Sequence, residues 1–436
     1  MSHPRAVPLR RLATAAVAVL VSASALIGCS ASGGSDDDTF TILQYEGKTS
    51  AQYLAWQKAV DIFQEAHPDV TIDFTSTSFD TMQKNGKLLL SGNNVPDVVE
   101  VNKGNSDAGQ LAAQGLIDPL DDQAAEYGWD QDVTGAMTAL ARYDEEGKAG
   151  SGSWYGVPNI GEFIVWYYNK DMFAQAGIDT PPTTMAELES IMQTFSDEGV
   201  TPVASGASGF GALWTWYGLV SAGADRTLID DFMFLQGDPV LDQGPFAEGT
   251  ARFADWIGKG YLGSQIAAVT GDQMNAAFLS GASPMIVENS AAFANITTQA
   301  SFDWGTFLLP EAALNPGSSG HLWAVPAKSG NKDLAYDWIE TTLSPEVQNA
   351  ISENNGLPLV GDPATITEPR AKALNEQFQQ VLATDGISFF PDYPVPGLLD
   401  FQQSGMQSLV NETTTAQDFV DGMQTFYDEG RARVDG

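Results

Sequence analysis

An alternation of strand-like and helix-like segments near the amino terminus limits the fold of this chain more than any other feature. Residues 40–45 and 70–74 are rich in β-branched and aromatic residues, and residues 53–63 between them carry large apolar side chains at helical spacing. A third strand-like run follows at residues 97–101. Strands that alternate with helices predict an α/β fold with right-handed strand–helix–strand units and a ligand crevice at the carboxyl ends of the strands.

The composition is that of an acidic chain of 436 residues, long enough for two or three units with cores of their own. Its 56 Asp and Glu against 20 Lys and Arg give a formal charge of -36, which repels phosphate backbones and argues against nucleic acid as a partner. One Cys excludes a disulfide framework, and three His are too few for a His-rich metal site. We therefore expect no metal and no cofactor.

The first 28 residues have the form of an export signal. Three arginines precede an apolar stretch at residues 12–27, and the tetrad Leu-Ile-Gly-Cys that ends at Cys29 resembles the lipobox of bacterial lipoproteins, whose cysteine thiol receives a diacylglycerol group. The alternative is an ordinary signal peptide that happens to end next to a cysteine. Residues 29–38 predict a flexible tether, so we expect the folded part outside the cytoplasm, held at a membrane face.

Three polar residues stand where strand-like runs end. Glu46 follows the first run, and Glu100 and Asn102 lie at the end of the third. Because the carboxyl ends of parallel strands meet at one edge of a sheet, we expect these side chains to point toward a common crevice. The alternative for each is an acid or amide on a solvated loop.

Residues 155–188 carry the motifs on which a family resemblance depends. They include Tyr-Gly-Val-Pro at 155–158, Tyr-Asn-Lys-Asp at 168–171 and a capping box from Thr184 to Glu187 that begins a further helix. Other pieces of the same pattern are Pro-Asp-Val-Val at 96–99, Gly-Leu-Ile at 115–117, Ala-Phe-Leu-Ser-Gly at 277–281, Pro-Met-Ile at 284–286 and Ser-Pro-Glu at 344–346. Together they resemble the extracellular solute-binding proteins of ABC sugar importers, the family that includes maltose-binding protein.

The resemblance implies two doubly wound α/β lobes that are joined by a hinge and close on a ligand held between them. Carried onto this chain, lobe one is residues 39–161 plus 302–343, and lobe two is residues 162–301 plus 344–436. It also implies a monomeric, non-enzymatic binding component that delivers a carbohydrate to the permease subunits of an ABC transporter in the membrane.

The resemblance assigns several binding residues. Glu162 matches, by its spacing, a hinge glutamate that contacts sugar hydroxyls in the family; the alternative is a hinge acid that only pairs with a cation. Glu288 and Asn289 lie where the strand-like run 285–287 ends, near the second crossover. The sequence departs from the family at two stacking tryptophans, which align with Ala291 and with Asp400, so that two rings are lost and an acid is gained; Asp400 is therefore itself a candidate binding residue. The ligand should therefore differ from maltose in size, linkage or hydroxyl pattern.

Tryptophans are the second group of candidates, because indole rings stack on the apolar faces of sugars. Trp214 and Trp216 follow a glycine-rich loop, and Trp323 begins a strand-like run next to a loop that borders the cleft in the family. The alternative for each tryptophan is a place in a hydrophobic core. His321, just before Trp323, is expected to be a surface loop residue.

The proline-rich run at residues 389–396 supplies the remaining candidates. Asp392 and Tyr393 lie within it and are expected either at the cleft or in a plain connection between the lobes.

The ligand class that these residues favour is a neutral sugar or oligosaccharide. Carboxylates and amides bind hydroxyl groups, and hydrogen bonds to charged groups contribute about 1.5–3 kcal/mol each. Two alternatives remain open from the sequence: a polyamine or other non-sugar solute, which the acidic charge favours, and a cell-surface glycosidase. No Gly-x-Ser-x-Gly, phosphate-binding loop or His-Glu-x-x-His is present, and a pair of catalytic carboxylates could not be recognised by sequence spacing.

Overall fold

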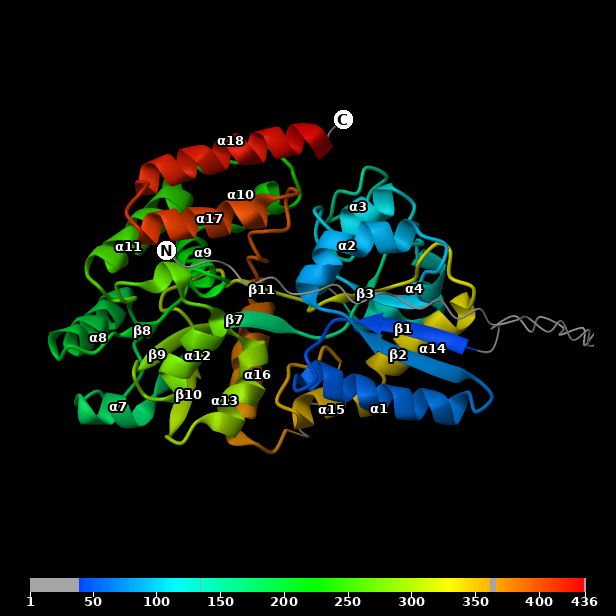
Figure 1. Ribbon diagram of the computed structural model, residues 1–436, viewed down its shortest axis with the longest axis horizontal. Coiled ribbons are helices and arrows are strands. Elements are labelled where there is room, and N and C mark those ends of the chain that lie inside the picture. The colour runs from blue at the N-terminus through cyan, green and yellow to red at the C-terminus, as the bar shows by residue number, and fades with distance from the viewer. Residues whose placement is uncertain (1–38, 134, 361–365, 435–436) are drawn as a thin grey trace, which may run out of the picture. The chain divides into compact units, whose positions relative to one another are not determined.

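A computed structural model describes residues 39–133, 135–360 and 366–434, all within the unit Asp38–Gly436 (Figure 1). The predicted export signal at residues 1–28, the lipidation site Cys29 and the tether at 29–38 lie outside the described residues. Within the described part of the chain, no helix is both long and apolar enough to cross a membrane.

The first sheet contains five of the described strands, in the order β2-β1-β3-β12-β6. β1 pairs in parallel with both β2 and β3, which confirms the predicted strand–helix–strand unit, whereas β12 runs antiparallel to β3 and β6. The strands are β1 (Thr39–Gln44), β2 (Thr71–Ser76), β3 (Val98–Val101), β6 (Val157–Pro158) and β12 (Leu322–Ala324).

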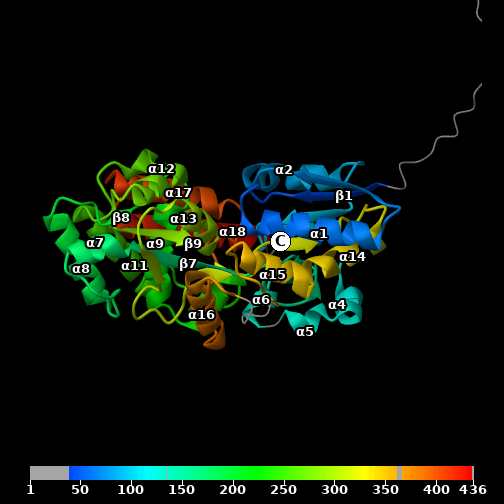
Figure 2. The ribbon, with the colours of Figure 1, turned by 90° about the horizontal axis from the view of Figure 1, so that it is seen from below.

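Helices cover both faces of this sheet. Figure 2 shows α2 on one face and α1 with α14 and α15 on the other. Ser50 caps the start of α1 and accepts a hydrogen bond from the backbone N–H of Tyr53, and Trp56 lies on the buried face of that helix. The elements of this lobe are α1 (Ala51–Ala66), α2 (Phe79–Ser91), α3 (Ala108–Ala113), α4 (Asp121–Tyr127), α5 (Trp129–Asp132), α6 (Ala136–Ala139), the hairpin of β4 (Arg142–Tyr143) and β5 (Ser153–Trp154), α14 (Lys332–Leu343) and α15 (Pro345–Glu353).

The second sheet is organised around β7 (Glu162–Asn169), whose eight residues are all buried, as expected for a strand covered on both faces. Its order is β10-β7-β9-β8, and β11 pairs with the beginning of β7. β7 runs antiparallel to β9 and β10, whereas β8 and β9 are parallel. The partner strands are β8 (Val203–Ala204), β9 (Met285–Asn289), β10 (Trp304–Phe307) and β11 (Gly317–Ser318).

The second lobe is mostly helical outside its sheet, and α17 and α18 lie above α9 and α11 in Figure 1. The predicted capping box is present at α8, where Thr184 and Glu187 cap each other's backbone N–H groups. The helices are α7 (Lys170–Gln175), α8 (Met185–Asp197), α9 (Gly211–Gly223), α10 (Arg226–Met233), α11 (Gly244–Gly258), the 3-10 turn η1 (Ile266–Ala268), α12 (Gly271–Leu279), η2 (Ser290–Ala292), α13 (Phe293–Gln299), α16 (Pro369–Ala383), α17 (Leu398–Val410) and α18 (Ala416–Val434).

Two of the expected lobe boundaries differ from the structure. Residues 302–318 were expected in lobe one, but β10 and β11 both pair with β7 and therefore extend the second sheet. Residues 344–357 were expected in lobe two, but α15 packs against α1, and Leu357 forms a bridge with Gly161 at the edge of the first lobe. The chain thus passes between the lobes near residues 161, 320 and 358, because β12 inserts between β3 and β6 of the first sheet, whereas β10 and β11 pair with β7 of the second.

Candidate functional site

Two neighbouring cavities lie between the lobes. One has a volume of about 320 Å³ and carries six aromatic side chains on its walls, so we call it the aromatic cavity. The other, of about 450 Å³, has charged or amide side chains at 10 of its 21 lining residues, and we call it the polar cavity. Five residues belong to the walls of both cavities: Tyr45, Phe79, Asn102, Phe210 and Asp392.

The ends of strands from both sheets position the polar groups of the aromatic cavity. Glu46 and Asn102 follow β1 and β3 of the first sheet, while Glu288 and Asn289 end β9 of the second. This is the edge at which an α/β sheet presents ligand-binding side chains. The site therefore receives groups from both lobes.

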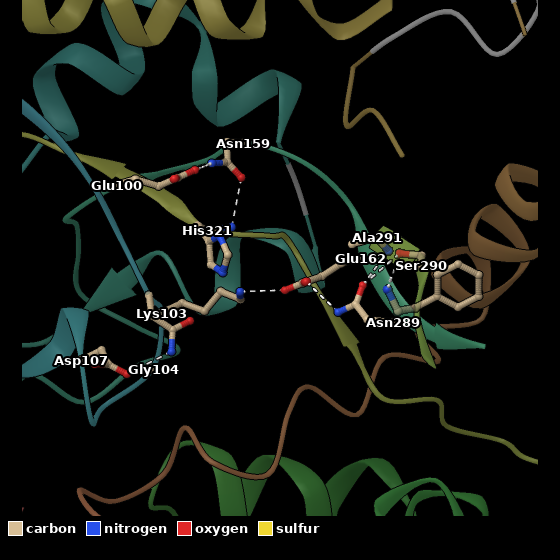
Figure 3. Close-up of polar contacts among 12 residues, drawn as sticks. Glu100, Lys103, Gly104, Asp107, Asn159, Glu162, Asn289, Ser290, Ala291 and His321 are labelled. Atoms are coloured by element: carbon tan, nitrogen blue, oxygen red, sulfur yellow. Dashed lines mark hydrogen bonds and ion pairs between the residues drawn. The ribbon is translucent and has the colours of Figure 1, made fainter. Parts of the chain in front are cut away.

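Glu162 lines the aromatic cavity and is bonded to groups of both lobes (Figure 3). Its Oε1 lies 2.8 Å from Nζ of Lys103, and its Oε2 accepts a hydrogen bond of 3.0 Å from Nδ2 of Asn289. The Lys103 side chain is 1% exposed and that of Glu162 is 9% exposed. Glu162 therefore pairs with a cation and also lines the cavity, so both its predicted role as a binding residue and the alternative of a hinge acid remain open.

The charge of Glu162 is stabilised despite its burial. Burial alone would raise the pKa of this carboxyl, but the charges of Lys103 and His321 and the hydrogen bonds from Lys103 and Asn289 together lower the pKa below its usual value. Lys103 also lies 5.4 Å from the centre of the Tyr393 ring and 6.0 Å from that of Phe390. These two contacts are cation–π interactions.

The pKa values of other carboxyl groups in the cavities are shifted in the opposite direction, above their usual values. Burial raises the pKa of Glu288 to about 7, although Asn275 and the backbone of Asn289 donate hydrogen bonds to it. Burial and the charge of Asp392 raise the pKa of Asp107 to about 7, and burial raises that of Asp392 itself to about 6. Near neutral pH these groups can therefore donate as well as accept hydrogen bonds.

Aromatic rings form the rest of the wall. Phe210 and Trp214, one turn apart at the start of α9, stack with ring centroids 5.1 Å apart and an interplanar angle of 17°. All ten tryptophans lie in the described part of the chain, and Trp214 is the one that is not buried. It is therefore the indole best placed to stack on a ligand.

The other two predicted tryptophans lie in the cores, which corrects their assignment to the site. Trp216 is fully buried, and its Nε1 donates to Oγ1 of Thr250 at 2.7 Å. Trp323 is fully buried in β12 between Trp56 and Trp338, with which it makes edge contacts at 5.6 Å. Both side chains fill space in the hydrophobic core and line neither cavity.

Glu100 is close to the site but does not line either cavity. It is fully buried, accepts hydrogen bonds from Nδ2 of Asn159 and from the backbone of Tyr45, and has a pKa well above its usual value because of burial and the nearby charge of Glu46. Figure 3 shows how Asn159 links Glu100 to the backbone of His321. We had expected this carboxylate to point into the crevice.

One group of described residues has the spacing of a metal site. Ligand atoms of Glu46, Glu100 and His321 lie within 4.8 Å of one another. Nδ1 of His321 lies 2.7 Å from Oε1 of Glu46, and Glu100 is held by the hydrogen bonds described above. Hydrogen bonding within the protein therefore accounts for this cluster.

The structure brings seven of the eleven predicted binding residues to the aromatic cavity: Glu46, Asn102, Glu162, Trp214, Glu288, Asn289 and Asp392. Asp400 lines the polar cavity instead, together with Asn102 and Asp392. Ala291, which replaces a stacking tryptophan of the family, lies on the wall of the aromatic cavity. His321, expected on the surface, also lines this cavity, as does Tyr393.

Sequence reasoning missed several residues of the walls, above all Lys103, Tyr45, Phe79, Phe210 and Phe390. Two signals were available. Lys103 directly follows Asn102 at a strand end, and Tyr45 directly precedes Glu46. Phe390 lies in the same proline-rich run as Asp392 and Tyr393, whereas Phe79 and Phe210 carry no signal in the sequence that separates them from core residues.

Comparison with known proteins agrees with this architecture. Residues 46–349 match the family model described as "Bacterial extracellular solute-binding protein". A "Probable sugar-binding periplasmic protein" of Rhizobium meliloti (strain 1021) is 26% identical over 245 residues, which cover 52% of this chain; the chain spans about half (49%) of the length of that relative. The "Diacetylchitobiose binding protein DasA" of Streptomyces coelicolor is 24% identical over 376 residues, 78% of this chain and 80% of that protein.

Solved structures share the fold. A structure named "Chitin oligosaccharide binding protein" superposes with a TM-score of 0.77 at 21% identity and covers 91% of this chain and 100% of its own. At that identity the likeness concerns the fold, with its two α/β lobes and the cleft between them. Since the family model matches well over half of the sequence, this chain belongs to the bacterial extracellular solute-binding proteins.

Proposed function

We propose that the protein binds a neutral sugar or oligosaccharide in the aromatic cavity and presents it to the permease of an ABC importer. The observation that carries this proposal is the chemistry of the cavity walls. The stacked rings of Phe210 and Trp214 offer a flat apolar surface, and carboxyl and amide groups share the same cavity. Sugars combine apolar C–H faces with hydroxyl groups, and this combination of groups fits both.

The relatives support the same ligand class. Two of them are named for sugar or diacetylchitobiose binding, and a third is named for mannitol, an uncharged polyol. Ala291 and Ala292, which lie on the cavity wall, leave space where a larger side chain would project. A ligand shape different from maltose follows from that space.

A polyamine is favoured only by the number of acids, and the electrostatics reduce that attraction. Lys103 pairs with Glu162, and the raised pKa values of Glu288 and Asp392 mean that these carboxyls are partly neutral near pH 7 and pH 6. The cavity therefore carries less negative charge than its composition suggests, which suits an uncharged guest.

The remaining parts of the proposal concern location and turnover. We infer that Cys29 carries a lipid anchor, that the monomeric protein works at the extracytoplasmic face of the membrane, and that it releases its ligand unchanged, without nucleic acid or a cofactor as a partner. A Cys29→Ser variant should then appear in the medium or the soluble extracytoplasmic fraction. Retention of that variant at the membrane would contradict the anchor.

Thermal unfolding with a ligand panel tests the ligand class. A ligand at about 100 times its Kd adds about 2.7 kcal/mol of stability, so a true ligand is easily seen. We expect at least one neutral glycan to stabilise the protein and to be recovered intact after incubation. Stabilisation by putrescine or spermidine with no response to any glycan would refute the sugar assignment, and release of reducing sugar would indicate a glycosidase.

A further inference from the structure

The polar cavity continues the aromatic cavity. The five residues common to both walls include three rings, Tyr45, Phe79 and Phe210, together with one amide and one carboxyl group, Asn102 and Asp392. The rings of Tyr45 and Phe79 meet edge to face at 5.7 Å, and Phe210 stacks on Trp214. The junction between the cavities thus has the composition of a sugar-binding surface, with apolar faces next to hydrogen-bonding groups.

The aromatic cavity alone is small. Its volume of about 320 Å³ lies near the lower end of the ~300–1,000 Å³ that is typical of ligand pockets. The polar cavity adds about 450 Å³, and a ligand that filled both would use the upper part of that range.

Opposite walls of the polar cavity come from different lobes. Lys84 and Lys87 lie on α2 of the first lobe, whereas Asp400 and Gln403 lie on α17 of the second. A ligand that extends into this cavity touches both lobes there as well as in the aromatic cavity. Each added contact of this kind favours the closed arrangement, because only that arrangement offers both walls at once.

We propose that the preferred ligand is an oligosaccharide that spans both cavities, with one sugar on the Phe210–Trp214 pair and the following units in the polar cavity between α2 and α17. This inference rests on the proposed sugar-binding function and adds ligand length to it. It also assigns Lys87 and Gln403, which no sequence argument singled out, as residues that select for length.

Calorimetric titration with chito-, xylo- and malto-oligosaccharides of one to five units tests the proposal. In the series that binds, we expect the affinity to rise from the monosaccharide until both cavities are filled. In Lys87→Ala and in Gln403→Ala, the ratio between the affinities for the tetrasaccharide and the monosaccharide should fall by about tenfold, as expected for one hydrogen bond of about 1.4 kcal/mol.

Two variants serve as matched controls: Lys58→Ala on the exposed side of α1 and Gln379→Ala on the exposed side of α16. In both control variants the affinity should depend on oligosaccharide length as strongly as in the unaltered protein. A monosaccharide that binds as tightly as the longest member of its series, with no effect of either cavity variant, would overturn the inference while leaving sugar binding intact. Failure of every glycan to bind the unaltered protein would instead refute the proposed function itself.

Discussion

Nζ of Lys103 lies 2.8 Å from Oε1 of Glu162, and this buried ion pair joins the end of a first-lobe strand to the beginning of the strand that enters the second lobe. Two charges removed from water in this way are stable only as a pair. The pair therefore fixes the floor of the site and makes its two members depend on each other.

Removal of one partner should be far more harmful than removal of both. Glu162→Gln leaves Lys103 buried without a counter-charge and should lower the free energy of unfolding by about 3–5 kcal/mol. The double variant Lys103→Met with Glu162→Gln should recover much of that loss. Urea unfolding of the unaltered protein, the two single variants and the double variant measures the coupling free energy between the two side chains. If the losses of unfolding free energy in the two single variants simply add up in the double variant, the pair contributes nothing.

Gly104 marks a close contact between the lobes and offers a second test. Its φ is +97°, and an added Cβ would lie 2.5 Å from Cβ of Tyr393. Gly104→Ala should therefore push the loop at residues 103–107 away from the proline-rich run of the second lobe, weaken ligand binding and lower the free energy of unfolding by roughly 2–4 kcal/mol through strain and overpacking.

The control for that variant is Gly115→Ala. Gly115 also has a positive φ, +61°, but nothing lies within 4 Å of the position of its added Cβ. This change should cost only the conformational strain of about 1–2 kcal/mol and leave ligand affinity unchanged. If both substitutions change ligand affinity equally, the contact between the lobes at Gly104 is not the cause of the change.

Trp214 is expected to contact the ligand directly. Trp214→Ala should reduce the affinity for a bound glycan by roughly tenfold, because a stacked ring is worth about 0.5–1.5 kcal/mol beyond its buried area, while Trp214→Phe should retain most of it. Titration of intrinsic fluorescence follows the binding in the unaltered protein. Tyr336→Ala, which removes a half-buried ring from α14, is the control, and an unchanged affinity in Trp214→Ala would contradict the stacking role.

The raised pKa of the Glu288 carboxyl predicts how the free energy of unfolding depends on pH. Its pKa is raised to about 7 in the folded protein, against about 4.3 in an unfolded chain, so the folded state holds a proton more tightly. Its contribution to stability is fully present below about pH 4 and is lost as the pH rises toward 7. Glu288→Gln should flatten this decline in unfolding experiments between pH 4.5 and 8, whereas Glu346→Gln at an exposed position should not; a decline of equal slope in Glu288→Gln would refute the assignment.

Much of the fold could be predicted from local patterns. The first strand–helix–strand unit and the capping box at Thr184 depend on neighbouring residues, and the sequence displays both. The lobe boundaries depend on which distant strands pair with β7, and no local pattern records that choice. For this reason residues 302–318 were expected in the wrong lobe.

The residues of the site divide in the same way, into those that local patterns predict and those whose place depends on distant parts of the chain. Strand-end residues such as Glu46, Asn102 and Asn289 could be placed because the carboxyl edge of a sheet collects them. Trp214 and Trp216 are two positions apart on α9 and face different surroundings, one the cavity and the other the core. The sequence does not reveal which of the two faces the core, because either arrangement would bury one indole ring and leave the other at the cavity. Lys103 was missed because its importance comes from Glu162, 59 positions away.

The repeated passage of the chain between the lobes has a consequence for synthesis. The middle of the first sheet needs β12, which begins at Leu322, and α1 obtains its cover from helices that end at Glu353. A growing polypeptide therefore cannot complete even its amino-terminal half until about four fifths of it has left the ribosome. Until then its apolar strands stay uncovered, and exposed strands of this kind are prone to aggregation.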